Sequence, residues 1–362
     1  MAKKIVSQWS AIEEAVQRGE KFWVGVDVHT KKYAVCILTE SGVWHSFITP
    51  ADDKGLARLF TERGLRPEVV VYEAGLTGFG LYRACQEAGL KGMVVSANRI
   101  PRPACKGAKT DLIDCRLLAE LASKKLLKGI YVPTEEQEAR RALFRRRQDL
   151  ARILGKAKVK IKSFLTCHGL PVPSRSWSEK EIAQLTALAA GLRPGLKETL
   201  ESLLNDLNYL RQAKAKVNAE VKALVLPQDK PDVLQSAPGV GPVVSAAFRA
   251  EIIDPKRFDS PEQLTGFTGL APTVKQSGES RGQAHLIPSG QGALRSLLIE
   301  SAWILLGKSA WAKTFYKRLL ARGGSSQKAI TALARKLAII LWRLWLEDRF
   351  YVDDYQSTPI SE

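Results

Sequence analysis

The sequence predicts an α/β domain followed by a region that is almost entirely helical. Two observations carry this prediction. Short apolar runs rich in β-branched residues alternate with helical patterns through about the first 125 residues, as in an α/β sheet domain. After a boundary at Tyr131–Pro133, the pattern from Glu135 to about Val225 is that of long helices, and further helical patterns reach Glu347.

The N-terminal domain is predicted to have the order βββαβαβα, preceded by a helical extension at about residues 7–19. Each predicted strand is a short apolar run bounded by polar or Gly-containing turns. This order is that of the ribonuclease-H fold. The expected strands are Phe22–Val28, Tyr33–Leu38, Val43–Thr49, Val69–Glu73 and Gly92–Ala97, and the expected helices are Asp53–Arg63, Phe79–Ala88 and one that starts at Asp111.

The helical region after residue 133 is expected to break near Leu170–Ser174 and around Gly191–Gly195. Beyond these breaks, Leu200–Leu224 has leucines at helical spacing and resembles a long amphipathic helix or a coiled-coil arm. Two interpretations stay open for it. It is either a helical linker that packs on its own chain or an arm for dimerisation.

A third unit is predicted to start at Pro227. Within it, Ala237–Ser245 resembles the hairpin of a helix-hairpin-helix element, whose small residues let backbone amides approach a phosphate. A helix within Phe258–Pro272 and a polar, Gly-rich loop at Thr273–Gly292 should follow. The expected domains are a sheet domain at 1–132, a helical and coiled-coil region at 133–226, a mainly helical C-terminal domain at 227–350 and a flexible tail at 351–362.

The charge of the chain favours a polyphosphate partner. The 362 residues carry a formal charge of +18. Residues 99–162 alone hold 18 Lys and Arg against 7 Asp and Glu. A solvated helix face explains most short charge runs, but a basic stretch this long favours nucleic acid through counterion release. The candidate nucleic-acid-binding residues in it are Lys106, Lys109, Arg140, Arg141, Arg145, Arg146 and Arg147.

Cysteines and hydropathy indicate a cytoplasmic protein. The five cysteines include no CxxC pair and the four histidines are scattered, which argues against a zinc site and suits reduced thiols. The first twenty residues are polar and charged, so we expect no signal peptide. The apolar segment Ala329–Leu346 is interrupted by Arg335, Lys336 and Arg343, so we expect an amphipathic helix and no membrane partner.

Four acidic residues occupy positions that suit a magnesium site. Asp27 lies in the first predicted strand, and Glu73 ends the fourth. Asp111 and Asp114, at the start of a predicted helix, share one helical face. Four carboxylates at one point would repel strongly unless cations lay between them, and hard oxygen ligands suit Mg²⁺ or Mn²⁺. A pair of such ions can clamp a phosphodiester during in-line displacement.

The spacing of these acids favours one class of nuclease. Each acid alone has an ordinary explanation, so the joint pattern carries the prediction. Four-acid exonucleases usually place the second acid two residues after the first, but position 29 is His, and Glu73 comes much later, as in junction resolvases. An actin-like kinase or ATPase would need a Gly-rich phosphate loop after its first strand, and Asp27–Thr30 contains no glycine.

The loop Gln276–Gly282 is a second candidate for chemistry. Ser277, next to a glycine, can present its hydroxyl to a phosphate, and Arg281 is placed to hold the charge of that phosphate. From these residues alone, an ordinary polar surface loop is the better interpretation.

A resemblance to a known family changes that balance. The sequence is similar to the insertion-sequence IS110 family of transposases, and the motifs follow the family's order over nearly the whole chain. The matching motifs are Gly25–Asp27, Tyr72–Gly75, Lys109–Asp114, Pro238–Gly241, Gly266–Pro272 and Ser277–Gly278. Two departures are modest: the N-terminal extension is longer than in the shortest members, and Cys115 stands where alanine is common.

The resemblance implies an N-terminal RuvC-like domain and a C-terminal domain with a nucleophilic serine. It implies that Asp27, Glu73, Asp111 and Asp114 bind Mg²⁺ and that Ser277 forms a phosphoserine ester with DNA. Members are recombinases guided by a structured RNA that the element encodes. The serine and the acids of one site come from different protomers, so a dimer and a synaptic tetramer are implied, acting on donor and target DNA at the bacterial nucleoid.

The sequence therefore predicts an insertion-sequence recombinase that exchanges DNA strands through Ser277 and the four acids. One alternative is a RuvC-type Holliday-junction endonuclease that uses a metal-activated water, with no covalent intermediate. Another is an RNA-binding protein with a degenerate nuclease fold, which the intact acids disfavour.

Overall fold

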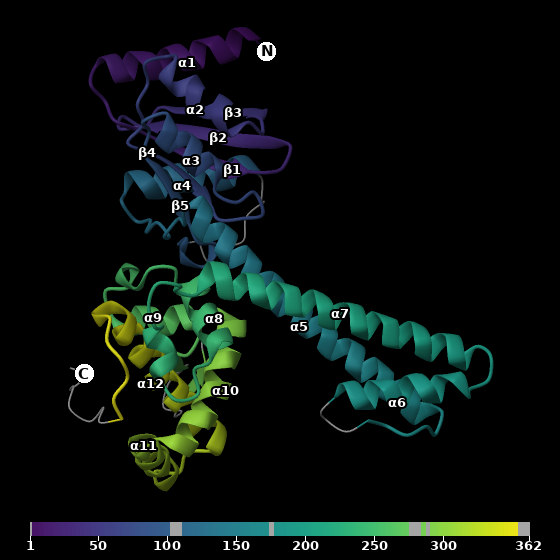
Figure 1. Ribbon diagram of the computed structural model, residues 1–362. Helices are drawn as coiled ribbons and strands as arrows, with labels where there is room; N and C mark the ends of the chain where they lie inside the picture. The colour runs from purple at the N-terminus through teal and green to yellow at the C-terminus, as the bar shows by residue number, and fades with distance from the viewer. Residues whose placement is uncertain (1, 102–110, 174–176, 275–283, 287–289, 354–362) are drawn as a thin grey trace. The chain divides into compact units, whose positions relative to one another are not determined.

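The computed structural model describes residues 2–101, 111–173, 177–274, 284–286 and 290–353. At residues 2–8, 111, 274, 284 and 285 it describes the backbone alone. The chain divides into two compact units, Met1–Val132 and Pro133–Glu362 (Figure 1). Each is described below by itself.

The first unit is built on a five-stranded sheet with the order β3-β2-β1-β4-β5. The first three strands are antiparallel neighbours, and β4 and β5 join them in parallel. The order βββαβαβα, closed by α4, confirms the predicted sequence of elements. The elements are α1 (Ala2–Gln17), β1 (Phe22–Val28), β2 (Lys32–Thr39), β3 (Trp44–Pro50), α2 (Asp53–Thr61), β4 (Val69–Glu73), α3 (Gly80–Glu87), β5 (Gly92–Val95), the 3-10 turn Ala97–Arg99 and α4 (Asp111–Ser123).

The two faces of this sheet are covered by different helices. One core joins the β1 residues Val24 and Val26 to Phe60 of α2 and Leu81 of α3. On the opposite face, alternate residues of β4 pack against Leu118, Leu121 and Ala122 of α4. Successive side chains of a strand point to opposite faces, so a strand covered on both sides is apolar almost throughout, which explains the sequence of β1 and β4.

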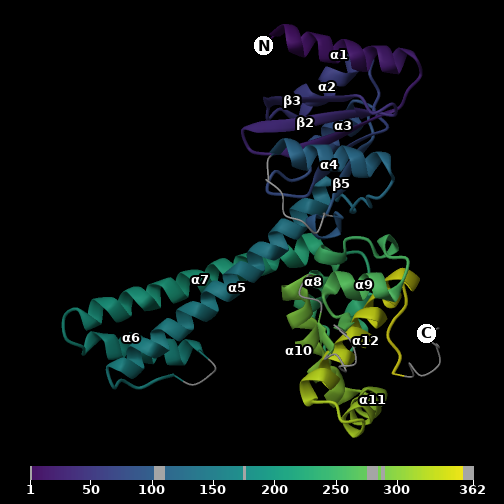
Figure 2. The ribbon, with the colours of Figure 1, turned by 180° about the vertical axis from the view of Figure 1, so that it is seen from behind.

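The second unit begins with a helical hairpin, here called the arm. Its members are α5 (Glu135–Cys167), α6 (Glu179–Ala190) and α7 (Leu196–Val225), and Figure 2 shows α5 beside α7 with α6 at one end. Thr134 starts α5 with a capping box, in which its side chain and that of Gln137 satisfy each other's backbone amides. Leu154, Ile161, Leu185, Leu200 and Leu207 are among the buried residues that hold the three helices together. A long amphipathic helix, α7, stands at the predicted place and packs its leucines within the arm, and dimerisation through the arm stays a prediction.

The rest of the second unit is a mainly helical C-terminal domain. Its core centres on α12, which contributes Leu333, Leu337 and Leu341, and it includes Phe144 of the arm. None of the helices in the described ranges combines the length and apolarity that a bilayer crossing needs. The elements are the 3-10 turns Val233–Ser236 and Pro255–Arg257, α8 (Pro242–Ile252), α9 (Pro261–Thr268), β6 (Pro272–Val274), β7 (Ala284–Leu286), α10 (Gly292–Lys308), α11 (Ala310–Ala321) and α12 (Ser326–Glu347).

Two predictions need correction. The segment predicted as a plain loop after Pro272 contains two short antiparallel strands, in which Pro272 pairs with Leu286 and Val274 with Ala284. Three-residue strands are too short to produce a recognisable alternation in a Gly-rich sequence. The N-terminal helix is also longer than predicted, because α1 starts at Ala2.

Candidate active site and nucleic-acid interface

Asp27 and Glu73 lie at the same edge of the five-stranded sheet. β1 and β4 are parallel, and their register pairs the residues that immediately precede the two acids. Two residues earlier on each strand, Gly25 and Val71 contact α4. The two-residue period of a strand places both acids on that same face. Both acids are half-buried.

The third acid is brought to the strand by a backbone contact. A methyl group on Gly25 would lie 2.0 Å from the carbonyl oxygen of Cys115 and 2.7 Å from the amide nitrogen of Ala119. The backbone of α4 therefore rests directly on β1. Asp114 immediately precedes Cys115 and is half-buried, so this contact brings it close to the strand that carries Asp27.

Electrostatics supports the same placement. The hydrogen bond with Cys36 and then burial raise the pKa of the Cys115 thiol, and the negative charge of Asp27 raises this pKa further. An effect of Asp27 on Cys115 requires the acid to lie near the start of α4, because Coulomb interactions weaken with distance.

The fourth acid, Asp111, is the first residue of α4, and its side chain lies outside the described residues. Among the side chains that are described, no group of three or more His, Cys, Asp or Glu is arranged to hold a metal ion. The backbone nevertheless carries Asp27, Glu73 and Asp114 to one edge of the sheet, and carboxylate oxygens are the donors that Mg²⁺ prefers. The donor chemistry fits the ion, and the four-ligand site stays a prediction.

His29 is a neighbour of this site that the sequence did not mark as functional. Its Nε2 atom lies 3.1 Å from Oδ2 of Asp27, and half of its side chain is exposed. The signal was present in the sequence, since residues two apart on a strand point to one face. In the sequence, His29 stands where four-acid exonucleases have an acid, and this position by itself predicts no role for the imidazole.

The proposed nucleophile, Ser277, lies in the sequence between the two short strands β6 and β7, which pair with each other. Ser277 and Arg281 both lie outside the described residues. The described strands β6 and β7 flank this segment, and Val274 pairs with Ala284 where the two strands meet it. The roles of Ser277 and Arg281 stay predictions.

Comparison with known proteins gives the family of the chain. The family model of DEDD transposases of the IS110 type matches residues 24–168, and the model "Transposase IS116/IS110/IS902 family" matches residues 232–317. A putative transposase of Sinorhizobium fredii, y4qE, is 30% identical, and the match covers 92% of this chain and 91% of that protein. The chain belongs to the IS116/IS110/IS902 family of transposases.

Further matches agree with this family. The transposase for insertion sequence element IS1111A of Coxiella burnetii is 28% identical over 91% of this chain and 90% of its own length. The match to a solved structure, T. thermophilus RuvC in complex with Holliday junction substrate, covers 30% of this chain and 99% of that chain at 13% identity and a TM-score of 0.21. The range matched by the first family model includes the four candidate acids, and the range matched by the second includes Ser277.

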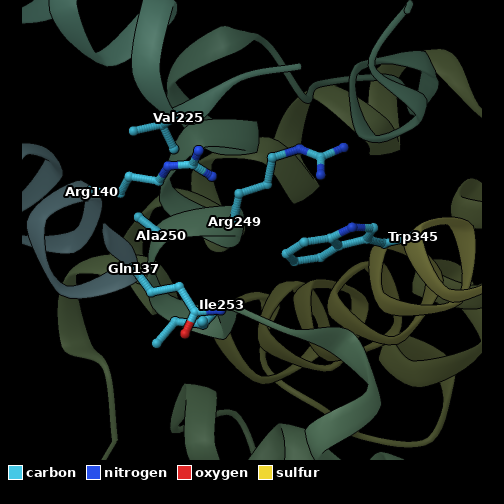
Figure 3. A pocket seen from close by; sticks show the side chains of 7 residues that line it. All are labelled: Gln137, Arg140, Val225, Arg249, Ala250, Ile253 and Trp345. Carbon is cyan, nitrogen blue, oxygen red and sulfur yellow. The ribbon is translucent and has the colours of Figure 1, made fainter. Parts of the chain in front are cut away.

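The structure separates the basic residues of this transposase by their partners. Lys106 and Lys109 lie outside the described residues. Arg140 pairs with Glu136 at 2.6 Å on the exposed side of α5. It also lines a small cavity of about 110 Å³, together with Arg249 and Trp345 (Figure 3). The Arg249 guanidinium lies 4.7 Å from the centre of the Trp345 ring and 2.6 Å from Asp232, so it contributes to the packing of the domain.

Two candidate arginines anchor the arm to the C-terminal domain. The Arg145 guanidinium makes two hydrogen bonds to the carboxylate of Glu251, at 2.9 and 3.0 Å. Arg141 donates to the carbonyls of Ala250 and Glu251 in the last turn of α8, where the helix dipole favours a cation. Glu251 is buried, and nothing in the sequence pattern around it predicts that it pairs with two arginines.

The remaining two arginines of the candidate set differ from each other. Arg147 donates to Oδ1 of Asn218 on α7 at 3.1 Å and is half-buried. Arg146 is exposed, and no described residue accepts a hydrogen bond from its side chain. Only Arg146 of the triplet therefore offers a guanidinium that is not engaged by the described part of the chain.

The middle of the arm carries a local excess of cations. Neither residues 150–167 of α5 nor residues 207–219 of α7 contain an acid. Burial lowers the pKa of Lys214, and the charges of Arg147 and Lys158 lower it further, so these three cations lie close together. Clustered cations of two helices suit a phosphate-bearing partner. The two segments also contain Lys156, Lys160, Lys162 and Lys216.

Proposed function

We propose that this transposase excises and inserts its element by RNA-guided strand exchange, with Ser277 as the nucleophile. The proposal is supported by the shared sheet edge of Asp27 and Glu73 and by the close contact of the start of α4 with β1 at Gly25. Family membership supports DNA as the substrate. The proposal that an RNA guides the reaction is supported by the resemblance to the family and by the cationic middle of the arm.

The proposed reaction conserves the energy of the phosphodiester. The Ser277 hydroxyl attacks phosphorus, an Oγ–P bond forms and one strand P–O bond breaks. The leaving deoxyribose oxygen takes up the proton that the hydroxyl loses. A second strand's hydroxyl then reverses these bond changes, so rejoining needs no ATP. Divalent ions held by Asp27, Glu73, Asp111 and Asp114 would neutralise the phosphate, and they fit the oxygen donors of that edge.

The deciding experiment is a denaturing gel of a labelled, nicked core substrate incubated with the protein. Wild type and Ser280→Ala should give a band of DNA joined to protein, and Ser277→Ala should give none while still binding DNA. Free DNA ends with no adduct, together with a Ser277→Ala variant that still cuts, would instead establish a metal-activated water as the nucleophile, as in a junction endonuclease.

The metal assignment has its own readout. Ions that bind only the folded state raise the melting temperature, and the rise grows with the ratio of the free ion concentration to the dissociation constant. Mg²⁺ should therefore stabilise wild type and Ser277→Ala but not Asp27→Asn or Glu73→Gln. Without metal, these two variants should be at least as stable as wild type, because one repulsive charge is removed. Equal Mg²⁺ stabilisation of all four proteins would exclude the site.

A further inference from the structure

A groove in the C-terminal domain lies between the β6–β7 hairpin and the first half of α12. Its volume is about 400 Å³, within the range of small-molecule sites. The apolar part of its lining includes Leu270, Pro272 and Leu286, and the polar part includes Lys328, Thr331 and Arg335 of α12. The groove therefore combines an apolar surface with a cationic one.

The charges at this groove are not balanced by the domain. Lys328 and Arg335 make no salt bridge with any described residue, and Lys328 is exposed. Lys328 stands in the first turn of α12, which has no acid, although a helix N-terminus disfavours a cation. The exposed carboxylate of Glu262 interacts with the charge of Arg335. Positive charge accumulates along this helix, because burial and then the charges of Arg335, Arg318 and Arg343 lower the pKa of Lys336.

We propose that this groove binds one unpaired nucleotide of a nucleic-acid strand. The base lies against Leu270, Pro272 and Leu286, and its phosphate lies between Lys328 and Arg335. An apolar lining serves only a base that has left the stack, because a duplex hides its base faces. DNA and RNA share this chemistry.

The place of the groove in the fold connects it to the proposed reaction. Pro272 and Leu286 are the paired outer residues of β6 and β7, the two strands that flank the segment containing Ser277. A nucleotide held against them binds next to the hairpin from which that segment leaves. This connection rests on the proposed function, whereas binding by the groove does not.

The test measures binding of a fluorescent twelve-nucleotide thymidine strand, its uridine counterpart and the corresponding duplex. Lys328→Ala with Arg335→Ala should weaken single-strand binding about tenfold and lower the salt slope by about 1.4, at about 0.7 for each phosphate contact. Thr331→Phe, which fills the groove, should weaken binding about tenfold without changing the slope, because it removes no cation. The control Lys308→Ala with Lys317→Ala removes the same charge from exposed sites of the same domain and should have less effect on affinity.

Photocrosslinking provides a readout on the unmodified protein. A strand containing 5-iodouracil should crosslink to peptides with Leu270–Pro272 or Gln327–Arg335, and the preferred strand, thymidine or uridine, identifies DNA or RNA as the source. Crosslinks confined to other peptides, a duplex that binds as tightly as the single strand, or a folded Thr331→Phe that binds as wild type would each overturn the proposal. A protein that crosslinks here but never forms a DNA adduct retains the groove and loses only the serine chemistry.

Discussion

Gly25 determines how closely the acids of the two elements approach. The contact of its Cα with the backbone of α4 leaves no space for a side chain. Any larger residue must move the helix away from β1, and Asp114 moves with it. The glycine is therefore a structural requirement of the acidic site, although it carries no functional group.

Gly25→Ala should destabilise the protein by about 3 kcal/mol, because overpacking against a helix backbone cannot be relieved by a rotamer change. Gly155 is a suitable control, since it lies within α5 and a methyl group there would contact nothing within 4 Å. Gly155→Ala should stabilise by about 1 kcal/mol through helix propensity. Urea unfolding of the three proteins measures both effects, and a Gly25→Ala protein as stable as wild type would contradict the close packing.

Asp232 should make stability depend on pH in the acid range. Burial raises the pKa of this carboxyl, but hydrogen bonds from Arg249, Ser245 and Gln235 outweigh burial and hold the pKa below its ordinary 3.8. A lowered pKa contributes stability that is present above the ordinary value and is lost as pH falls through the folded-state value. Asp232→Asn should cost about 3 kcal/mol at pH 7, because it leaves Arg249 largely buried without its partner.

The free energies of unfolding of wild type and Asp232→Asn, measured from pH 7 down to pH 2.5, test this sign. Their difference should be constant above about pH 5 and shrink below pH 4, where the carboxyl of the unfolded chain takes up a proton while the folded one stays charged. A difference that grows as the pH falls would show that the carboxyl is not held in its charged form.

At the residue scale, the sequence was sufficient to predict the positions of residues that follow from strand and helix periodicity. Asp27 and Glu73 were placed correctly at strand ends, because apolar runs mark a buried strand and its period marks its faces. Glu251 and Arg249 could not be recognised, because their partners lie far away in the sequence. Pairing between distant residues depends on tertiary packing, which periodicity does not encode.

At the scale of elements, α5 divides its arginine triplet between two tasks. Arg145 holds the C-terminal domain through Glu251, whereas Arg146 is exposed to solvent. From the sequence, Arg145, Arg146 and Arg147 are together candidates for binding nucleic acid, because consecutive arginines look equivalent until the buried side of the helix is known. Consecutive residues of a helix point about 100° apart, so a triplet cannot share one face.

Arg145→Ala should lower the free energy of unfolding by about 2 kcal/mol, a value between those of exposed and buried ion pairs, because Glu251 is buried and half of Arg145 is exposed. Arg146→Ala should leave stability unchanged and reduce the salt slope of nucleic-acid binding by about 0.7 to 0.9. Denaturant unfolding and binding titrations at several salt concentrations separate the two. Equal effects of both variants on either measurement would contradict this division.

The elements themselves were predictable in proportion to their length. The boundaries of β1 and β4 agree with prediction, and the long amphipathic stretch of α7 was recognised. The strands β6 and β7 were missed, because a hairpin of three-residue strands depends on cross-strand bonds rather than on side-chain pattern.

At the scale of the whole molecule, the proposed sharing of sites between protomers predicts complementation. Ser277→Ala and Asp27→Asn should each be inactive alone. A mixture of the two should regain part of the recombination activity, because some sites then combine an intact acid set from one protomer with an intact serine from another.

The control for this experiment mixes the single variant Ser277→Ala with a double variant that carries both Glu73→Gln and Ser277→Ala. No protomer of this mixture has the Ser277 hydroxyl. That mixture should remain inactive. Failure of the first mixture to recover activity, with mixed oligomers demonstrated by differential tags, would place the serine and the acids of each site on one chain.

The anchoring of α5 by Glu251 has a mechanical consequence. From Arg145 to Cys167 the helix is a stiff rod about 33 Å long, at about 1.5 Å per residue. Its base is clamped to α8 by an ion pair at Arg145 and by the buried ring of Phe144. If such a rod stays straight, a displacement of its far end by about 3 Å corresponds to a rotation of about 5° at its base. A force on the tip of the arm would therefore reach the C-terminal domain through Arg145 and Phe144.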